Sequence, residues 1–183
     1  MRLQGTKYAN FAKFTNMLRN SEIFEMKNFI ILICLSFLSS SCLKNTHQKK
    51  AALVLENKKI IQEAFKNVVE NMDATEKTIT AYFSSDYTQL VDGKIINYND
   101  FVAHMKAQKS ALQSVKIIFK HLVAEGDMVA TIHTAEAIKK NGDLIKVQVN
   151  AMFIIKNGKI ISCDELTRLI EGKKSDADIG SRH

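Results

Sequence analysis

Glu165 and His133 are the residues of this 183-residue chain whose types best suit proton-transfer chemistry in a shared pocket. Each lies in an alternating segment that predicts a β-strand, 128–138 for His133 and 160–170 for Glu165. A glutamate in an apolar cavity has a raised pKa and can take a proton next to a carbonyl. A nearby histidine or tyrosine can stabilise the oxyanion that then develops. The alternative is a buried polar pair, or part of a dimer face, without chemistry.

The register of two hairpins decides whether the two side chains share a face, because a slip of one residue turns every side chain over. If both Asn-Gly turns are three-residue loops, Val149 faces His133 on one side and Glu165 on the other. The Cα atoms of His133 and Glu165 are then about 10 Å apart. If both are two-residue turns, Val147 faces Glu136 instead and Glu165 points out of the pocket. The residues alone leave both registers open.

Tyr82, Tyr87 and His104 can approach this pocket from the predicted helical side of the domain. Each also has an ordinary structural role, the tyrosines as core residues with a hydroxyl at a cavity wall and His104 as a solvated or capping residue. No Cys/His cluster has the spacing of a metal site, and the chain contains neither a glycine-rich phosphate loop nor a G-x-S-x-G elbow. We therefore expect no metal and no cofactor.

The elements that position these residues predict an α+β domain. A composition of 46% hydrophobic and 25% charged residues is that of an ordinary globular protein and excludes a mainly disordered chain. Apolar residues recur every three or four positions over 53–72, which predicts a helix; a short helix capped by Asp73 follows, and a third begins near residue 100. Asp92-Gly93 predicts a hairpin. Four strands joined by Gly-containing turns form an antiparallel meander, at 115–124, 128–138, 144–155 and 160–170.

The first fifty residues have the pattern of a targeting region. From Met26, a short basic start, an apolar run and small residues before Cys42 are typical of an export signal. The apolar run is about ten residues, half of what a membrane span needs. We expect 26–41 to be a signal peptide, 42–50 a tether, and 1–25 an extension or a start site placed too far upstream.

Three groups of motifs follow one another along the expected domain: Tyr82-Phe83-Ser84-Ser85-Asp86-Tyr87 leading to Val91-Asp92-Gly93-Lys94, then Ala124 to Ala130, and Phe153 to Ile160 running on to Asp164-Glu165. In this order they resemble the NTF2-like superfamily, in particular its SnoaL-like branch. The resemblance implies a cone in which three N-terminal helices pack on a curved antiparallel sheet. It covers the domain expected at 51–172, before a flexible tail at 173–183. It also favours the first register, with Glu165 inside, and implies a homodimer.

Two departures from the family pattern bear on catalysis. Many members carry an acid two residues before the phenylalanine of the penultimate strand, and that position is Ala151 here. The aromatic residue common near the end of the last strand is also absent, since the chain has no tryptophan. Both departures weaken the expectation of ketosteroid-isomerase-like chemistry.

The residues before Cys42 are similar to a bacterial lipobox. Ser40 and Ser41 fit that pattern, whereas Ser39 replaces the usual leucine. The resemblance implies that Cys42 is lipidated and that the protein is an exported lipoprotein of the bacterial cell envelope, facing the periplasm or the exterior. The lipid would be its only membrane attachment. Cleavage without lipidation and an uncleaved anchor remain alternatives.

Taken together, these patterns favour a domain that binds a small, largely apolar molecule in the cone. An isomerase, cyclase or dehydratase that uses Glu165 as its general base is one alternative, and a homodimeric interaction module of the envelope is another. The formal charge of +7 does not indicate nucleic-acid binding, because arginine is scarce after residue 42, at Arg168 and Arg182 only.

Overall fold

The computed structural model describes residues 46–176. The expected extension (1–25), signal peptide (26–41) and Cys42 lie outside the described residues. The chain divides into two units at Lys49/Lys50. Of the first unit only residues 46–49 are described, and they are helical. No helix within 46–176 is long and apolar enough to cross a membrane.

The second unit begins with a helix over residues 50–64 that passes into a π-helical turn, η1 (Phe65–Val69). Asn57, Ile61, Ala64 and Val68 are its buried residues and recur at steps of three and four, as the sequence pattern predicts. The π turn is closed by the Glu70 amide, which donates to the Phe65 carbonyl at 2.9 Å. This helix therefore offers one apolar side to the rest of the domain.

Two shorter helices complete the helical side. α2 (Glu76–Tyr82) is capped by Thr75 and Thr78, not by Asp73, because Thr75 is the residue with extended backbone next to the first helical turn. α3 (Tyr98–Ala111) begins with a reciprocal capping box between Asn97 and Asp100. The expectation of three N-terminal helices holds only in part, since α3 follows the first hairpin of the sheet.

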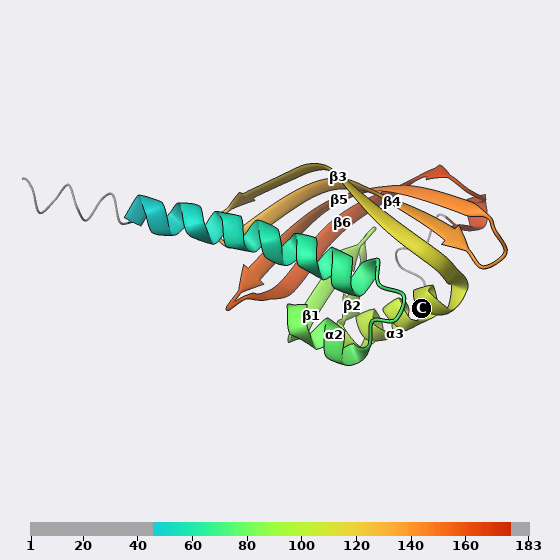
Figure 1. Ribbon diagram of the computed structural model, residues 1–183, viewed down its shortest axis with the longest axis horizontal. Coiled ribbons are helices and arrows are strands. Elements are labelled where there is room, and N and C mark those ends of the chain that lie inside the picture. The colour runs from blue at the N-terminus through green and yellow to red at the C-terminus, as the bar shows by residue number, and fades with distance from the viewer. Residues whose placement is uncertain (1–45, 177–183) are drawn as a thin grey trace, which may run out of the picture. The chain divides into compact units, whose positions relative to one another are not determined.

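Six strands form one sheet in the order β2-β1-β6-β5-β4-β3. Their bounds are β1 (Phe83–Val91), β2 (Lys94–Asn97), β3 (Leu112–Glu125), β4 (Met128–Lys139), β5 (Leu144–Lys156) and β6 (Lys159–Glu171). The meander β3–β6 is antiparallel and strongly curved, and the helices lie on its concave side (Figure 1). β1 pairs parallel to β6, so the expected all-antiparallel sheet is wrong at this pairing. Local hairpin signals could not reveal it, because the two strands lie far apart in the sequence.

The β4–β5 hairpin has the register predicted for a three-residue loop. His133 pairs with Val149, and Ile138 pairs with Leu144. The turn is closed by the Lys139 amide, which donates to the Asp143 carbonyl at 2.9 Å. His133 therefore points to the concave side of the sheet.

The β5–β6 hairpin differs from both predicted registers. Its turn is a two-residue Asn157-Gly158 turn, in which both residues have positive φ (51° and 72°). A bulge at Ile161 then adds one residue to β6, after which Ala151 pairs with Glu165 and Val149 with Thr167. The predicted Val149–Glu165 pairing is thus wrong by two residues. Because two is an even number, Glu165 still points to the same side as His133.

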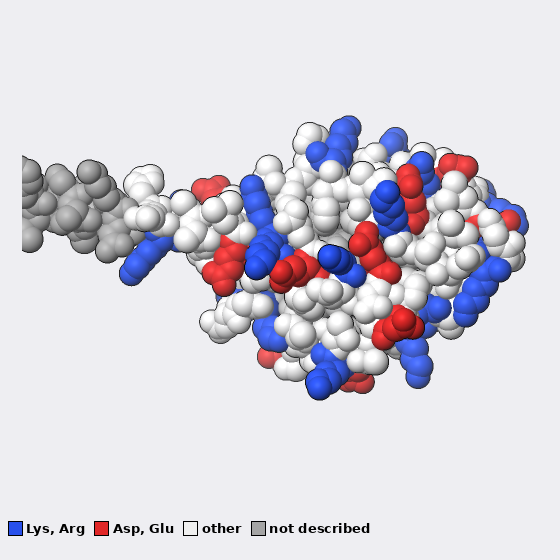
Figure 2. All heavy atoms as spheres, in the orientation of Figure 1, with Lys and Arg blue, Asp and Glu red and all other residues white. Residues whose placement is uncertain are grey.

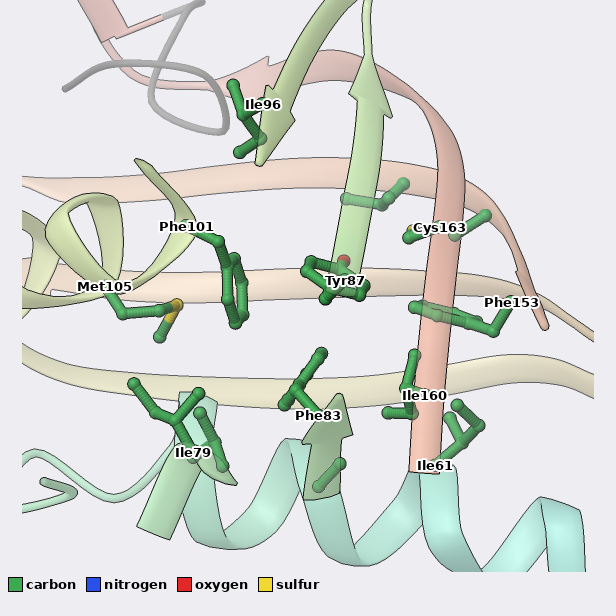
Figure 3. Close-up of a cluster of buried hydrophobic side chains, with 14 of the residues drawn as sticks. Ile61, Ile79, Phe83, Tyr87, Ile96, Phe101, Met105, Phe153, Ile160 and Cys163 are labelled. Carbon is green, nitrogen blue, oxygen red and sulfur yellow. The ribbon is translucent and has the colours of Figure 1, made fainter. Parts of the chain in front are cut away.

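A single cluster of buried side chains fills the space between helices and sheet. It includes Ile61, Ile79, Phe83, Phe101 and Phe153, which come from all the layers of the domain (Figure 3). The chain after β6 also packs: η2 (Lys174–Asp176) lies within the predicted flexible tail, yet Asp176 is only 3% exposed. Lys139 holds it with an ion pair of 2.5 Å.

Candidate functional site

A cavity of about 140 Å³ lies inside this cluster. Its wall is mostly apolar and comes from the π turn, α3 and the concave faces of β1 and β3–β6. Several of its residues, among them Phe65, Gln108 and Val115, are partly exposed, so the cavity is not fully enclosed. The polar residues on its wall are Tyr87, Gln89, His104, Gln108, His133, Cys163, Glu165 and Thr167.

Glu165 of β6 is the acidic residue of this wall. Its Oε1 accepts a hydrogen bond from Nε2 of Gln89 at 2.9 Å, and its Oε2 lies 3.6 Å from Sγ of Cys163. Burial among apolar groups raises the pKa of Glu165 to about 7; the hydrogen bonds from Cys163 and Gln89 lower it, and the charges of Asp92 and Asp164 raise it further. Glu165 is therefore close to half-ionised at neutral pH.

The parallel pairing of β1 with β6 supplies the partners of Glu165. It places Gln89 opposite Cys163 on the neighbouring strand. The hydroxyl of Tyr87 donates to Oε1 of Gln89 at 3.2 Å, which leaves the amide nitrogen of Gln89 directed at Glu165. Burial, together with the nearby Cys163 and Glu165, keeps the pKa of Tyr87 well above its ordinary value. Tyr87 is thus a neutral donor within a short chain of hydrogen bonds.

Gln89 and Thr167 are wall residues that sequence reasoning did not identify. Gln89 alternates with Tyr87 along β1, so it shares that residue's face, but only the β1–β6 pairing shows that Glu165 lies beside it. The hydroxyl of Thr167 donates to Oδ2 of Asp92 at 2.5 Å, and its amide donates to Oδ1 at 2.8 Å. Asp92 therefore fixes β6 from the β1–β2 turn.

His133 lies on the same wall but not beside Glu165. It is 3% exposed, and its Nδ1 is 3.0 Å from Oγ1 of Thr131. Burial lowers the pKa of His133 to about 4, so the ring is neutral at physiological pH. Thr131 pairs with Ala151, and Ala151 pairs with Glu165. Thr131, and not His133, therefore lies in the same row across the sheet as Glu165. Strand spacing and rise place the Cα atoms of His133 and Glu165 about 12 Å apart.

The structure places the remaining candidates differently from one another. His104, from α3, is buried and lines the cavity, and Tyr87 does so from β1. Tyr82 does not line it: α2 ends at Tyr82, its hydroxyl accepts from Nδ2 of Asn67 at 2.6 Å, and the next residue, Phe83, lines the cavity instead. The sequence pattern predicted a helix that includes Phe83, whereas α2 ends at Tyr82. This difference of one residue accounts for the wrong placement of Tyr82. Among residues 46–176, no group of three or more His, Cys, Asp or Glu side chains could hold a metal ion.

Comparison with known proteins identifies a relative across nearly the whole of its length. The chain is 32% identical over 126 residues to uncharacterized protein C11D3.04c of Schizosaccharomyces pombe, a match that covers 69% of this chain and 96% of that protein. This chain belongs to the C11D3.04c family. The name of this relative states no activity, and no family model matches the chain.

Solved structures establish the fold of this member of the C11D3.04c family. A SnoaL-like protein of Jannaschia sp. CCS1, assigned as a polyketide cyclase, has a TM-score of 0.55 at 11% identity, over 63% of this chain and 87% of that one. An LEH-like epoxide hydrolase of M. tuberculosis has a TM-score of 0.54 at 19% identity, over 63% and 84%. AclR of Streptomyces galilaeus, assigned as a hydroxylase, has a TM-score of 0.51 at 17% identity, over 74% and 87%. The domain thus has the NTF2-like, SnoaL-like fold.

Proposed function

We propose that this protein binds a small, largely apolar molecule inside the cone. The observation that carries the proposal is the cavity of about 140 Å³, which is lined mainly by apolar and aromatic side chains and has Glu165 on its wall. An apolar cavity of about 150 Å³ is large enough for benzene. A molecule built on a single ring therefore matches this volume.

The comparisons support a small-molecule pocket without naming its occupant. The same fold is used by an epoxide hydrolase and by a protein assigned as a polyketide cyclase. On the face seen in Figure 2, basic and acidic side chains are interspersed, and no broad basic patch covers it. This face therefore lacks the concentrated basic surface that a nucleic-acid partner prefers.

The test compares the binding of a small probe, toluene, to the wild type and to a variant whose cavity is filled by a larger side chain. Saturation transfer from the protein to toluene, followed by NMR, should be seen for the wild type. Ala135→Leu places a larger side chain on the cavity wall and should abolish it, whereas Thr134→Leu changes the neighbouring residue on the other face of β4 and should not. No transfer in the wild type, or equal transfer in both variants, contradicts the proposal.

A second candidate function is general-base catalysis by Glu165, of the isomerase, cyclase or dehydratase kind. The observation that favours it is the place of Glu165 on the apolar cavity wall, because burial there raises the pKa of Glu165 to about 7, near the optimum for a base at neutral pH. Against it, Ala151 offers no acid, and the hydroxyl proton of Tyr87 is directed at Gln89. Once a turnover is found, an unchanged rate in Glu165→Gln would exclude Glu165 as the base.

We also propose that the protein is exported and anchored through a lipid on Cys42. The support is the sequence pattern around Met26 and Cys42. A mass spectrum of protein purified from its own membranes tests it. A mass that starts at Cys42 with added acyl chains is expected, and tryptic peptides from residues 1–25 would contradict the proposed start at Met26.

A homodimer through the outer face of the sheet is the last part of the proposal. Ile118, Met152 and Leu166 are 43%, 47% and 64% exposed, and each lies on a strand of β3–β6. Their strand positions have the parity opposite to that of the cavity residues, so they point away from the cone. Exposed apolar residues gathered on one face favour a contact with another protein surface.

A further inference from the structure

The hydrogen bonds around Glu165 occupy most of the donors of the cavity wall. The hydroxyl of Tyr87 is used by Gln89, and the hydroxyl of Thr167 is used by Asp92. One amide N–H of Gln89 is used by Glu165. The remaining polar wall residues from α3, His104 and Gln108, also have partners of their own.

Glu165 itself keeps unused acceptor capacity. A carboxylate has about four lone-pair positions. Here one full-strength donor, Nε2 of Gln89, reaches Oε1, while Oε2 has only the weak thiol donor of Cys163 at 3.6 Å. Figure 3 shows Cys163 and Tyr87 on neighbouring strands, with the rings of Phe101 and Phe153 nearby. Glu165 lines the cavity together with these two rings.

We propose that the cavity selects ring-sized apolar molecules that carry one hydrogen-bond donor, a hydroxyl or an amine, which Oε2 of Glu165 accepts. This inference rests on the proposed small-molecule function and narrows its ligand class. A donor on the ligand satisfies the under-used oxygen, and the ring occupies the apolar remainder of the cavity.

Above the pKa of Glu165, a ligand with only an acceptor group gains no hydrogen bond from the carboxylate. Its oxygen would face the carboxylate, where two acceptors meet without a proton between them. His133 could donate from its second ring nitrogen, but it lies about 12 Å from Glu165 between Cα atoms, in the next row of the sheet. It therefore cannot serve the same ligand atom.

Two isomeric probes separate the two kinds of ligand. Benzyl alcohol carries a donor, anisole carries only an acceptor, and toluene provides the apolar baseline. At a pH above the pKa of Glu165, benzyl alcohol should bind the full chain about tenfold more tightly than anisole, since a hydrogen bond to a charged group is involved. Benzylamine, measured alongside, shows whether an amine is preferred to a hydroxyl.

Two variants attribute this preference to Glu165. Glu165→Gln replaces one acceptor oxygen with a donor and should lose most of the preference for the donor ligands. Asp164→Asn removes the neighbouring charge, which is exposed and paired with Met152, and should keep it. A normal thermal transition in both variants shows that they are folded.

The possible outcomes test the two proposals separately. If toluene and anisole bind but neither donor compound binds more tightly, the inference about the donor is overturned and cavity binding stands. If Asp164→Asn loses the preference to the same extent as Glu165→Gln, the inference is also overturned, because the effect is then not local to the cavity. If none of the compounds binds, the proposed function itself fails, and this inference fails with it.

Discussion

Ala151 pairs directly with Glu165 across β5 and β6, on the concave side of the sheet. Ala151 is also the position at which the family resemblance leads one to expect an acid. Its small side chain places no acid at the position that faces Glu165 on β5.

Ala151→Asp should bring two acids into contact across this pair. Directly opposed residues have Cβ atoms about 5 Å apart. Repulsion between the two charges should raise the pKa of Glu165 above about 7. The new buried acid should also cost roughly 1–3 kcal/mol of stability. NMR titration of the glutamate side chains measures the first effect, and an unmoved or lowered pKa would show that the two residues do not face each other.

Stability should fall with rising pH through the titration of Glu165. The folded-state pKa of about 7 lies above the ordinary value of 4.5, so the folded state holds this proton more tightly than the unfolded state. As the pH rises from 4.5 to about 7, the free energy of unfolding should fall by an amount on the order of 3 kcal/mol. The other titratable groups near Glu165 are Cys163, Tyr87, Asp92 and Asp164.

His133 should act in the opposite direction. Its folded-state pKa of about 4 lies below the ordinary 6.5, so the unfolded state takes up the proton first and stability falls as the pH drops from 6.5 to 4. The two effects are similar in size and should nearly cancel where their ranges overlap. Urea unfolding measures both effects. Glu165→Gln keeps only the effect of His133, so its stability should rise with pH, whereas His133→Gln keeps only the effect of Glu165, so its stability should fall with pH. Flat profiles in both variants would contradict these shifts.

Removing one partner of the Lys139–Asp176 ion pair should destabilise the domain. The two side chains are only 21% and 4% exposed, so the partner that is left behind is a poorly solvated charge. Asp176→Asn or Lys139→Met should each cost about 3 kcal/mol, and the double variant should cost less than the sum. Urea unfolding at neutral pH measures all three. Strict additivity would show that the pair is not coupled.

Leu166→Glu should weaken a dimer formed through the outer face of the sheet. A charge in the centre of an apolar contact is poorly tolerated. Ile95→Glu is the matched control, because Ile95 is 78% exposed but belongs to β2, at the edge of the sheet. Sedimentation velocity should show a dimer for the wild type and the control, and a monomer for Leu166→Glu. A monomeric wild type would contradict the proposed contact.

The sequence by itself determined the elements and the faces that they present. Alternation in four segments predicted β3 to β6 to within a few residues, because strand periodicity and positive-φ turns are local properties. Alternation left two registers open, and the one that the family resemblance favours put His133 and Glu165 on one side of the sheet; this holds although the predicted pairing of Val149 with Glu165 was two residues in error. An error of two residues leaves a side chain on the same face of the sheet, but it changes the distance between the two residues.

The tertiary structure decided which of these residues meet. The parallel pairing of β1 with β6 brings Gln89 to Glu165, and the two-residue turn together with the bulge at Ile161 places Glu165 in the row of Ala151, away from His133. Pairing between strands some 75 residues apart depends on how helices and sheet pack together, and no local pattern records it. A bulge is one extra residue stabilised by its surroundings, so its position also becomes visible only when the strands are in place.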